Sequence, residues 1–252
     1  MKISRDVELT KRARNLFKTF LLFDNLDQKA TDAFPLNNLY NLNHGEELDL
    51  RDGFYIIIDG IVLGTRTHCF KAPLKRINKK LAHTQLHSPG DFVGESCLIK
   101  PVYQNYSTGQ KHDHCLFVLS DEATVWHTHT DGLRAFRENY PQFNFNLLDL
   151  LIIKKEGLEE FSTESNLDGV HKILILLRKI GMMYRKNNNS DVVLPKFFTQ
   201  EVIGQLIGLC RENVNRAFND PQLDKFIIRH DGGGNISGIR VPRSFLNTPP
   251  LI

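Results

Sequence analysis

The sequence predicts an α+β protein made of an N-terminal antiparallel β-roll, a long helix and a C-terminal winged helix-turn-helix. Short β-like runs separated by turns follow residue 36, a pattern typical of a small antiparallel barrel or roll. A helical pattern begins at Pro141, because proline is favoured in the first turn of a helix. Between Phe198 and Phe218, two short helical stretches flank a glycine turn. We therefore expect domains at residues 1–141 and 166–252, joined by a helix and hinge at 142–165.

Composition narrows the class of protein. A chain of 252 residues is long enough for about two domains. Apolar residues make up 41% and charged residues 24%, which indicates a soluble globular protein. The longest apolar runs are too short to cross a bilayer, and the first ten residues lack the apolar core of a signal peptide. Cysteines at positions 69, 97, 115 and 210 lack the paired spacing of a zinc or redox site. We expect a cytoplasmic protein with reduced thiols and no membrane partner.

The N-terminal half predicts helices followed by strands. Residues 7–34 carry one apolar helical face, interrupted at Asp24 and Asn25. Turns are expected at Asp59–Gly60 and Pro89–Asp91. The expected strands are β-branched and aromatic runs: Phe54–Ile58, Ile61–Leu63, Cys115–Leu119 and Ala123–Trp126. Two polar stretches are expected to be exposed loops, Lys71–Lys80 and Pro101–Asp113; the first is basic, and a DNA or ligand role is its alternative to simple solvation.

The helix that begins at Pro141 is expected to reach about Phe161 and to form a homodimer interface. Its apolar residues alternate spacings of four and three, the pattern of a coiled-coil seam. The seam consists of Leu147, Leu151, Lys154, Leu158 and Phe161. Lys154 weakens such a contact unless its ammonium group escapes to the rim. The alternative is an ordinary helix packed on its own β-domain. A hinge is expected at Ser162–Gly169, and an apolar helix at 170–184.

The stretch from Phe198 to Phe218 has the layout of a helix-turn-helix. Thr199 suits an N-cap, and Gly208 allows the tight turn. The residues expected to be buried recur at helical spacing: Val202, Ile203, Leu206 and Ile207 in the first helix, with Val214, Ala217 and Phe218 in the second. The residues expected to share the outer face of the second helix are Arg211, Glu212, Asn215 and Arg216.

The outer residues have the chemistry of base recognition. Arginine pairs with guanine O6 and N7, glutamate accepts from cytosine, and asparagine pairs with adenine. The alternative is an exposed amphipathic helix with a Glu212–Arg216 ion pair. Residues 170–252 hold 12 Lys+Arg against 6 Asp+Glu, whereas residues 1–169 hold 20 against 23. A basic C-terminal third favours a nucleic-acid module. Two expected strands, Phe226–Ile228 and Ile236–Val241, flank the glycine-rich stretch 231–235 and predict a wing.

This order of parts resembles the CRP/FNR family of bacterial transcription regulators over nearly the whole chain. The most specific match is Ile203–Arg216, which is similar to the family's Ile-Gly motif followed by Arg-Glu-x-Val-x-Arg. Tyr55–Gly60 and Pro89–Glu95 resemble elements of its β-roll and nucleotide pocket. The resemblance implies a homodimer that reads an inverted repeat of TGTGA-like half-sites in double-stranded DNA, with RNA polymerase as a further partner. Its candidate DNA-binding residues are Thr199, Gln200, Arg211, Glu212, Asn213, Asn215 and Arg216, and its ligand-pocket candidates are Gly94, Glu95 and Ser96.

The sequence departs from the family pattern in the sensor region. Family members that bind cAMP have an arginine about ten residues after the Gly-Glu pair, but none occurs here between Glu95 and Arg134. A buried phosphate without a cationic partner is very costly. We therefore expect no regulation by cAMP, and the small-molecule effector stays unidentified. The N-terminal region also lacks the clustered cysteines of an iron–sulfur sensor. Cys97 is either a reactive thiol or a buried inert one, and Pro221 predicts a short second helix.

Two further interpretations stay open at this stage. One is a family member that has lost regulated ligand binding and acts constitutively or through a partner protein. The other is a cupin-like metal-binding protein or enzyme that uses two His-x-His pairs, His112/His114 and His127/His129. If the strands carrying them are neighbours, four imidazoles can meet a transition metal. Surface histidines at strand ends explain the same pattern, so we predict no enzyme activity, no cofactor and no metal.

Overall fold

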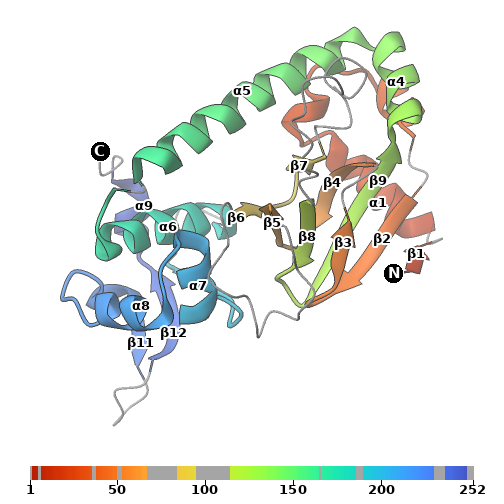
Figure 1. The fold of residues 1–252 in the computed structure, drawn as a ribbon. Coiled ribbons are helices and arrows are strands. Elements are labelled where there is room, and N and C mark those ends of the chain that lie inside the picture. The colour runs from red at the N-terminus through yellow and green to blue at the C-terminus, as the bar shows by residue number, and fades with distance from the viewer. Residues whose placement is uncertain are drawn as a thin grey trace. The chain divides into compact units, whose positions relative to one another are not determined.

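The computed structural model describes residues 2–4, 7–35, 38–49, 53–66, 84–94, 114–164, 166–185, 190–229 and 236–248. The chain forms two compact units, Met1–Gly157 and Leu158–Ile252 (Figure 1). The first unit combines helices with two antiparallel sheets, and the second combines helices with one small antiparallel sheet. An α+β class with antiparallel strands is confirmed.

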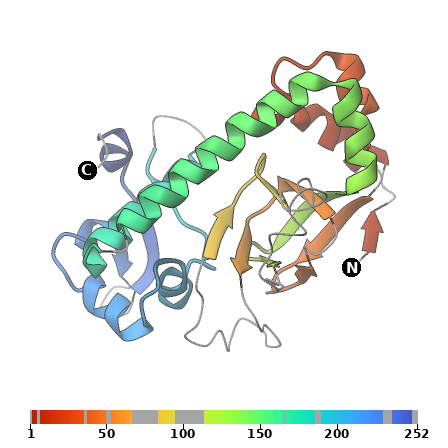
Figure 2. The same ribbon diagram turned by 45° about the horizontal axis from the view of Figure 1, so that its top comes forward.

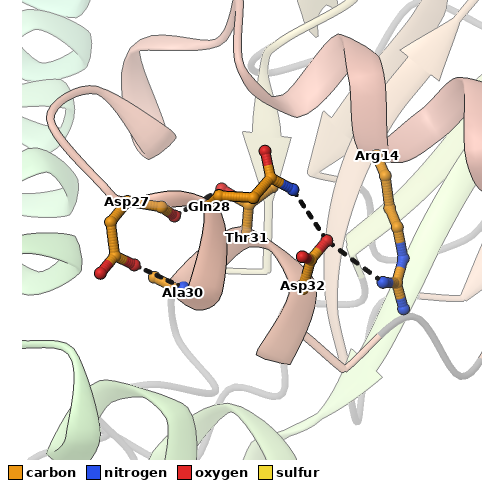
Figure 3. A network of polar contacts seen from close by, with 6 residues as sticks. All are labelled: Arg14, Asp27, Gln28, Ala30, Thr31 and Asp32. Carbon is orange, nitrogen blue, oxygen red and sulfur yellow. Dashed lines mark hydrogen bonds and ion pairs between the residues drawn. The ribbon is translucent and has the colours of Figure 1, made fainter.

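The N-terminal helices of the first unit are short and tied to one another by polar contacts. They are α1 (Val7–Phe17), the 3-10 helix η1 (Leu21–Phe23) and α2 (Gln28–Ala33). Asp27 caps α2, its Oδ1 accepting from the Ala30 amide at 2.7 Å. Arg14 and Gln28 both reach the carboxylate of Asp32, at 3.5 and 2.9 Å, so α1 is fastened to α2 (Figure 3). Asn25 has a φ of 56°, which fits the predicted break.

Two antiparallel sheets form the body of the first unit. The five-stranded sheet has the order β1-β2-β9-β4-β7, and the four-stranded sheet has the order β3-β8-β5-β6. The strands of the first sheet are β1 (Lys2–Ser4), β2 (Asn38–Asn43), β9 (Glu122–His129), β4 (Gly53–Asp59) and β7 (Phe92–Val93). Those of the second are β3 (Glu47–Asp49), β8 (His114–Val118), β5 (Val62–Arg66) and β6 (Thr84–His87).

The five-stranded sheet is covered on both faces, and strand β4 shows this most clearly. Six consecutive residues from Gly53 to Ile58 are buried. Phe54, Ile56 and Ile58 belong to the core beneath the helices, whereas Tyr55 and Ile57 belong to the core between the two sheets. Alternate residues thus enter opposite cores, as the period of two in a strand requires. In both views the red N-terminal helices lie beside the green helix that follows β9 (Figures 1 and 2).

The turn between β4 and β5 depends on glycine. Gly60 has a φ of 83°, a conformation that residues with a Cβ atom rarely adopt. A Cβ atom built there would also lie 2.5 Å from the carbonyl oxygen of Glu122. The predicted Asp59–Gly60 turn is therefore present, and it permits close approach to the start of β9.

Two helices follow the last strand of the first unit. Helix α4 covers Thr130–Asn139, and α5 covers Pro141–Glu164, so Pro141 occupies the first helical position as predicted. Phe143 is fully buried, and Asn146 donates to the carbonyl oxygens of Leu22 and Asp24 at 3.1 and 2.7 Å. These contacts attach the N-terminal half of α5 to the first unit. The first unit therefore extends beyond residue 141, where the first domain was expected to end. Because α5 reaches Glu164, the first three residues of the stretch predicted as a hinge, Ser162–Gly169, are helical.

The second unit packs four helices with a three-stranded antiparallel sheet of order β10-β12-β11. The helices are α6 (Gly169–Tyr184), α7 (Gln200–Ile207), α8 (Arg211–Phe218) and α9 (Arg243–Asn247), with the 3-10 helix η3 (Asp224–Phe226). The strands are β10 (Val192–Val193), β11 (Ile227–Arg229) and β12 (Ile236–Val241). Asp168 caps α6, and its carboxylate accepts from the amides of Val170 and His171. Both strands predicted for the wing are confirmed, while residues 231–235 lie outside the described ranges.

Within the described parts of the chain, no helix has the length and apolar character needed to cross a membrane. The predicted loops at Lys71–Lys80 and Pro101–Asp113 fall outside those parts.

The aromatic core of the first unit yields a stability prediction. Phe34 is 1% exposed and its ring packs against five others: Phe17, Phe23, Trp126, Phe136 and Phe143. We expect Phe34→Ala to lower the free energy of unfolding of this unit by about 3–5 kcal/mol, through lost burial and a residual cavity. Trp126 is the single tryptophan of the chain and is fully buried here, so its fluorescence during urea unfolding reports this unit.

The matched control is Leu21→Ala. Leu21 is 64% exposed on neighbouring η1, so its truncation should change stability by less than about 0.5 kcal/mol. Equal effects of the two substitutions would contradict the described core.

Candidate nucleic-acid interface

Helices α7 and α8 are joined by a short turn whose geometry is set by one cap and one glycine. The hydroxyl of Thr199 accepts a hydrogen bond from the Val202 amide at 3.2 Å, which is the predicted N-cap. Gly208 ends α7 with a φ of 70°, in the left-handed region that favours glycine. The Leu209 amide then donates back to the Gly204 carbonyl oxygen at 2.8 Å. The chain therefore reverses direction immediately and starts α8 at Arg211.

The turn passes very close to α7 at Gly204. A Cβ atom at this position would lie 2.6 Å from the Leu209 carbonyl oxygen and 3.1 Å from Cγ2 of Val214. Any side chain larger than hydrogen would push the turn and α8 away from α7. The apolar residues expected inside are buried or half-buried: Val202, Ile203, Leu206, Ile207, Val214, Ala217 and Phe218. The orientation of α8 is thus fixed by packing on its inner face.

The outer face of α8 is polar and exposed, as predicted. Its members come from every position of the helix that does not pack inward: Arg211, Glu212, Asn213, Asn215 and Arg216. Cys210 is the N-cap residue and is also exposed. The helix ends at Phe218, and Asn219 follows as its C-cap, so it is short, as Pro221 predicted. The result is a two-turn helix that offers two guanidinium groups, one carboxylate and two amides to solvent.

Two candidate residues on α7 lie beside this outer face. Gln200 is the first residue of α7, and its Nε2 donates to Oδ1 of Asn215 on α8 at 3.5 Å. Thr199 precedes it and is exposed. The structure therefore brings the start of α7 to the middle of the α8 surface. The sequence pattern placed both residues in the site but did not indicate that they interact, because they are fifteen positions from Asn215.

The structure corrects the dimer seam predicted on α5, because the first three seam residues pack against the first unit. Leu147 is 4% exposed within the core of the first unit, and Leu151 packs half-buried against that core. Lys154 donates to the Phe92 carbonyl oxygen at 2.8 Å, and its Nζ lies 4.5 Å from the Phe92 ring centroid. All three side chains therefore face their own β-domain. Leu158 and Phe161 lie in the helix, but their side chains are outside the described set.

A different face of α5 is exposed and apolar. Its members are Phe145 (62%), Leu148 (55%), Ile152 (47%) and Ile153 (56%). Phe145, Leu148 and Ile152 are separated by three and four positions, so they form one stripe. The same spacing rule that selected Leu147, Leu151 and Lys154 also fits this stripe. Sequence reasoning missed it because α5 is apolar around most of its circumference, so periodicity alone does not identify the exposed face.

The ligand-pocket candidates are only partly described. Gly94 follows β7 with a φ of 91°, and a Cβ atom there would lie 2.1 Å from the Gly53 carbonyl oxygen. Close backbone approach to β4 is therefore sufficient reason for glycine at this position. Glu95, Ser96 and Cys97 lie outside the described residues.

Three of the four histidines in the two predicted pairs lie on described strands. His114 begins β8, whose partners are β3 and β5, whereas His127 and His129 lie on β9, whose partners are β2 and β4. The two strands belong to different sheets, so they are not hydrogen-bonded to each other. Among the described residues, no group of three or more His, Cys, Asp or Glu is placed to hold a metal ion. His112 falls outside them.

Two buried histidines of the first unit nevertheless have ring nitrogens without a hydrogen-bond partner. His127 is 5% exposed beside the rings of Tyr55 and Tyr40, and both of its ring nitrogens are unpaired. His87 is 3% exposed, and its Nδ1 is unpaired. Burial lowers the pKa of His127 to about 4, with a further contribution from His129. Burial and the ammonium of Lys154 lower the pKa of His87 to about 3.

Comparison with known proteins identifies the fold. No protein-family model and no curated protein matches the sequence. The cyclic nucleotide-binding domain protein of Listeria monocytogenes is 15% identical, with a TM-score of 0.58 over 83% of this chain and 91% of that chain. The c-di-GMP-responsive global regulator CLP of Xanthomonas campestris is 12% identical, with a TM-score of 0.59 over 86% and 99%. A protein described as a CRP/FNR-family transcriptional regulator from Eubacterium rectale is 10% identical, with a TM-score of 0.54 over 91% and 99%.

The fold is thus one shared by cyclic nucleotide-binding domain proteins and regulators of the CRP/FNR family. The resemblance predicted from the helix and β-roll motifs is confirmed at the level of the fold. These structural neighbours are described as binding or regulatory proteins.

The buried histidines predict an acid-sensitive first unit. Their folded-state pKa values lie below the ordinary value of 6.5, so the unfolded chain binds more protons between about pH 6.5 and pH 4. Stability is therefore complete above pH 6.5 and falls as the pH decreases through this window. Each histidine should account for roughly 1–2 kcal/mol of unfolding free energy lost between pH 7 and pH 5. Urea unfolding followed by Trp126 fluorescence measures the loss.

A matched pair of variants isolates the histidine contribution. His127→Phe should flatten the pH dependence of the unfolding free energy, because phenylalanine suits the aromatic surroundings and does not titrate. His171→Gln alters an exposed residue of the second unit and should leave that dependence unchanged. An unaltered pH profile in His127→Phe would show that this residue is not neutral and buried in the folded protein.

Proposed function

We propose that the protein is a homodimeric, sequence-specific DNA-binding transcription regulator. In this proposal, α7, α8 and the β11–β12 pair act as a winged helix-turn-helix, with α8 as the helix that enters the major groove. The observation that carries the proposal is the outer face of α8. It presents five polar side chains on a helix whose inner face is fully packed. A helix of this kind fits the major groove, where base edges differ in their donors and acceptors.

The individual side chains have matching roles. Arg211 and Arg216 can each pair with O6 and N7 of guanine, and Glu212 can accept from the amino group of cytosine. Asn213 and Asn215 supply amides that can meet bases or phosphates. Thr199 and Gln200, at the start of α7, lie beside this surface and are proposed to contact the backbone or to position α8. TGTGA-like half-sites are the corresponding sequence proposal.

The dimer is proposed to form through the exposed apolar face of α5, which consists of the stripe Phe145, Leu148 and Ile152 together with Ile153. These residues are between 47% and 62% exposed, and exposed apolar patches commonly mark interaction sites. A second copy of the same helix offers an identical stripe with coiled-coil spacing, so the contact is self-complementary. A symmetric dimer places two α8 helices against two half-sites, which matches recognition of an inverted repeat. RNA polymerase is the further partner implied by this class of protein.

The sensor is proposed not to respond to cAMP. Two structural neighbours are named for cyclic nucleotides, one as a cyclic nucleotide-binding domain protein and one as c-di-GMP-responsive. This chain has no arginine between Glu95 and Arg134 to neutralise a cyclic phosphate. His87 and His127 are neutral at neutral pH and therefore do not replace that charge. The protein instead acts with a different effector, or constitutively.

Selection of bound sequences from random DNA duplexes tests the proposed function. The protein should enrich an inverted repeat with half-sites about one helical turn apart. Arg216→Ala should relax the preference at one base pair of each half-site and cost roughly 1–3 kcal/mol at the selected sequence. The physical reason is loss of a bidentate contact to a base edge.

Arg134→Ala is the control, because Arg134 is exposed on α4 of the first unit. It should leave both affinity and selectivity unchanged. If Arg216→Ala keeps the full base preference, α8 is not the reading helix. If the unaltered protein enriches no sequence, the proposed function is wrong.

The dimer face can be tested with Leu148→Glu combined with Ile152→Glu. Both side chains are exposed in the single chain, so the substitutions should not disturb its core. Four like charges at a symmetric contact should shift the protein to a monomer in sedimentation velocity and weaken binding to the inverted repeat. Asp121→Lys combined with Glu138→Lys changes exposed charges of the first unit outside α5 and should leave the dimer in place. A doubly substituted Leu148/Ile152 protein that remains dimeric would place the interface elsewhere.

A further inference from the structure

The side chains of Gln200 and Asn215 form an amide–amide contact across the two helices of the candidate DNA site. Nε2 of Gln200 donates to Oδ1 of Asn215 at 3.5 Å. Gln200 is half-buried at the start of α7, and Asn215 is exposed on α8. We propose that Gln200 is a positioning residue that turns the Asn215 amide so that its NH2 group faces the DNA. This inference rests on the proposed function and specifies which bases the site prefers.

The direction of the hydrogen bond determines which atoms of the Asn215 amide remain available to the DNA. An unconstrained asparagine recognises adenine by donating to N7 and accepting from the N6 amino group. Here Oδ1 already accepts from Gln200, so the outward part of Asn215 is the NH2 group, which carries two donors. Guanine presents acceptors at N7 and O6, and thymine presents one at O4. Cytosine presents only an amino group, which needs an acceptor, and adenine presents an amino group beside a single acceptor at N7. Asn215 should therefore favour guanine or thymine at the base it meets.

The backbone positions of both residues are fixed, which leaves the side-chain contact to set the amide direction. Thr199 caps α7 immediately before Gln200, at 3.2 Å from the Val202 amide. Val214 and Ala217, on either side of Asn215, are buried against the inner face. A distance of 3.5 Å makes a long hydrogen bond, and Oδ1 keeps a second lone pair, so the contact biases the amide direction without locking it. We therefore expect a graded base preference and little effect on stability.

The substitution Gln200→Glu reverses the contact and gives a directional test. A carboxylate only accepts hydrogen bonds, so Asn215 must rotate to donate its NH2 group to the new side chain. Oδ1 then faces the DNA and selects the amino groups of adenine or cytosine. Selection from random duplexes is carried out with the full-length protein and with Gln200→Glu. Every base pair carries guanine or thymine on one strand and adenine or cytosine on the other. At the base pair read by Asn215, the strand on which the unaltered protein prefers guanine or thymine should change its preference to adenine or cytosine by about fivefold or more.

Asn215→Ala serves two purposes in the same experiment. First, the base pair that Asn215 reads is the pair at which this variant loses its base preference. In that background, Gln200→Glu should produce no change in base preference, although its negative charge should still weaken binding to all duplexes through phosphate repulsion. The double variant thus separates amide direction from net charge. Circular dichroism checks that the variants, which change only exposed or half-buried residues, retain their helices.

The possible outcomes are distinguishable. A preference switch that depends on Asn215 supports the inference. Unchanged preference in Gln200→Glu, or a switch that persists without Asn215, overturns it while leaving the proposed function intact. If Asn215→Ala keeps the base preference of the unaltered protein at every position, the inference is also overturned. Failure of the unaltered protein to select any sequence overturns both proposals together.

Discussion

The presentation of α8 depends on the close approach of the interhelical turn to α7 at Gly204. The Leu209 amide and carbonyl both lie against this residue, and Val214 packs beside it from α8. Because no side chain separates the two helices here, α8 cannot roll or slide without clashing with the backbone of α7. Its polar residues consequently occupy one defined surface. A recognition surface made of only two helical turns requires this rigidity, since small displacements would misalign every bidentate contact at once.

Much of the fold was predictable because it follows from local patterns. The β4 strand, the Asp59–Gly60 turn, the start of α5 at Pro141 and the cap at Thr199 each depend on residues within a few positions. The exposed face of α8 was predictable for the same reason, since helical spacing assigns Val214, Ala217 and Phe218 inward. These features need no knowledge of distant parts of the chain.

Features that depend on long-range packing were not predictable. The face of α5 that meets the β-domain is chosen by the shape of the core, so Leu147 and Leu151 lie inside while Phe145 and Leu148 lie outside. Likewise, His114 and His127 are close in sequence but lie on strands of different sheets, β8 and β9. The Gln200–Asn215 contact joins two helices and depends on how they cross. In each case the deciding information is which elements are neighbours in space.

The hydrogen bond from Lys154 to the Phe92 carbonyl oxygen also sets the rotational orientation of α5 about its own axis. Successive side chains on an α-helix point about 100° apart, so anchoring one of them determines the direction of all the others on the same rigid helix. With Lys154 held toward β7, Leu148 and Ile152 cannot turn inward without breaking this bond and withdrawing Leu147 from its core. The short strand β7 therefore helps to determine which side chains of α5 are exposed.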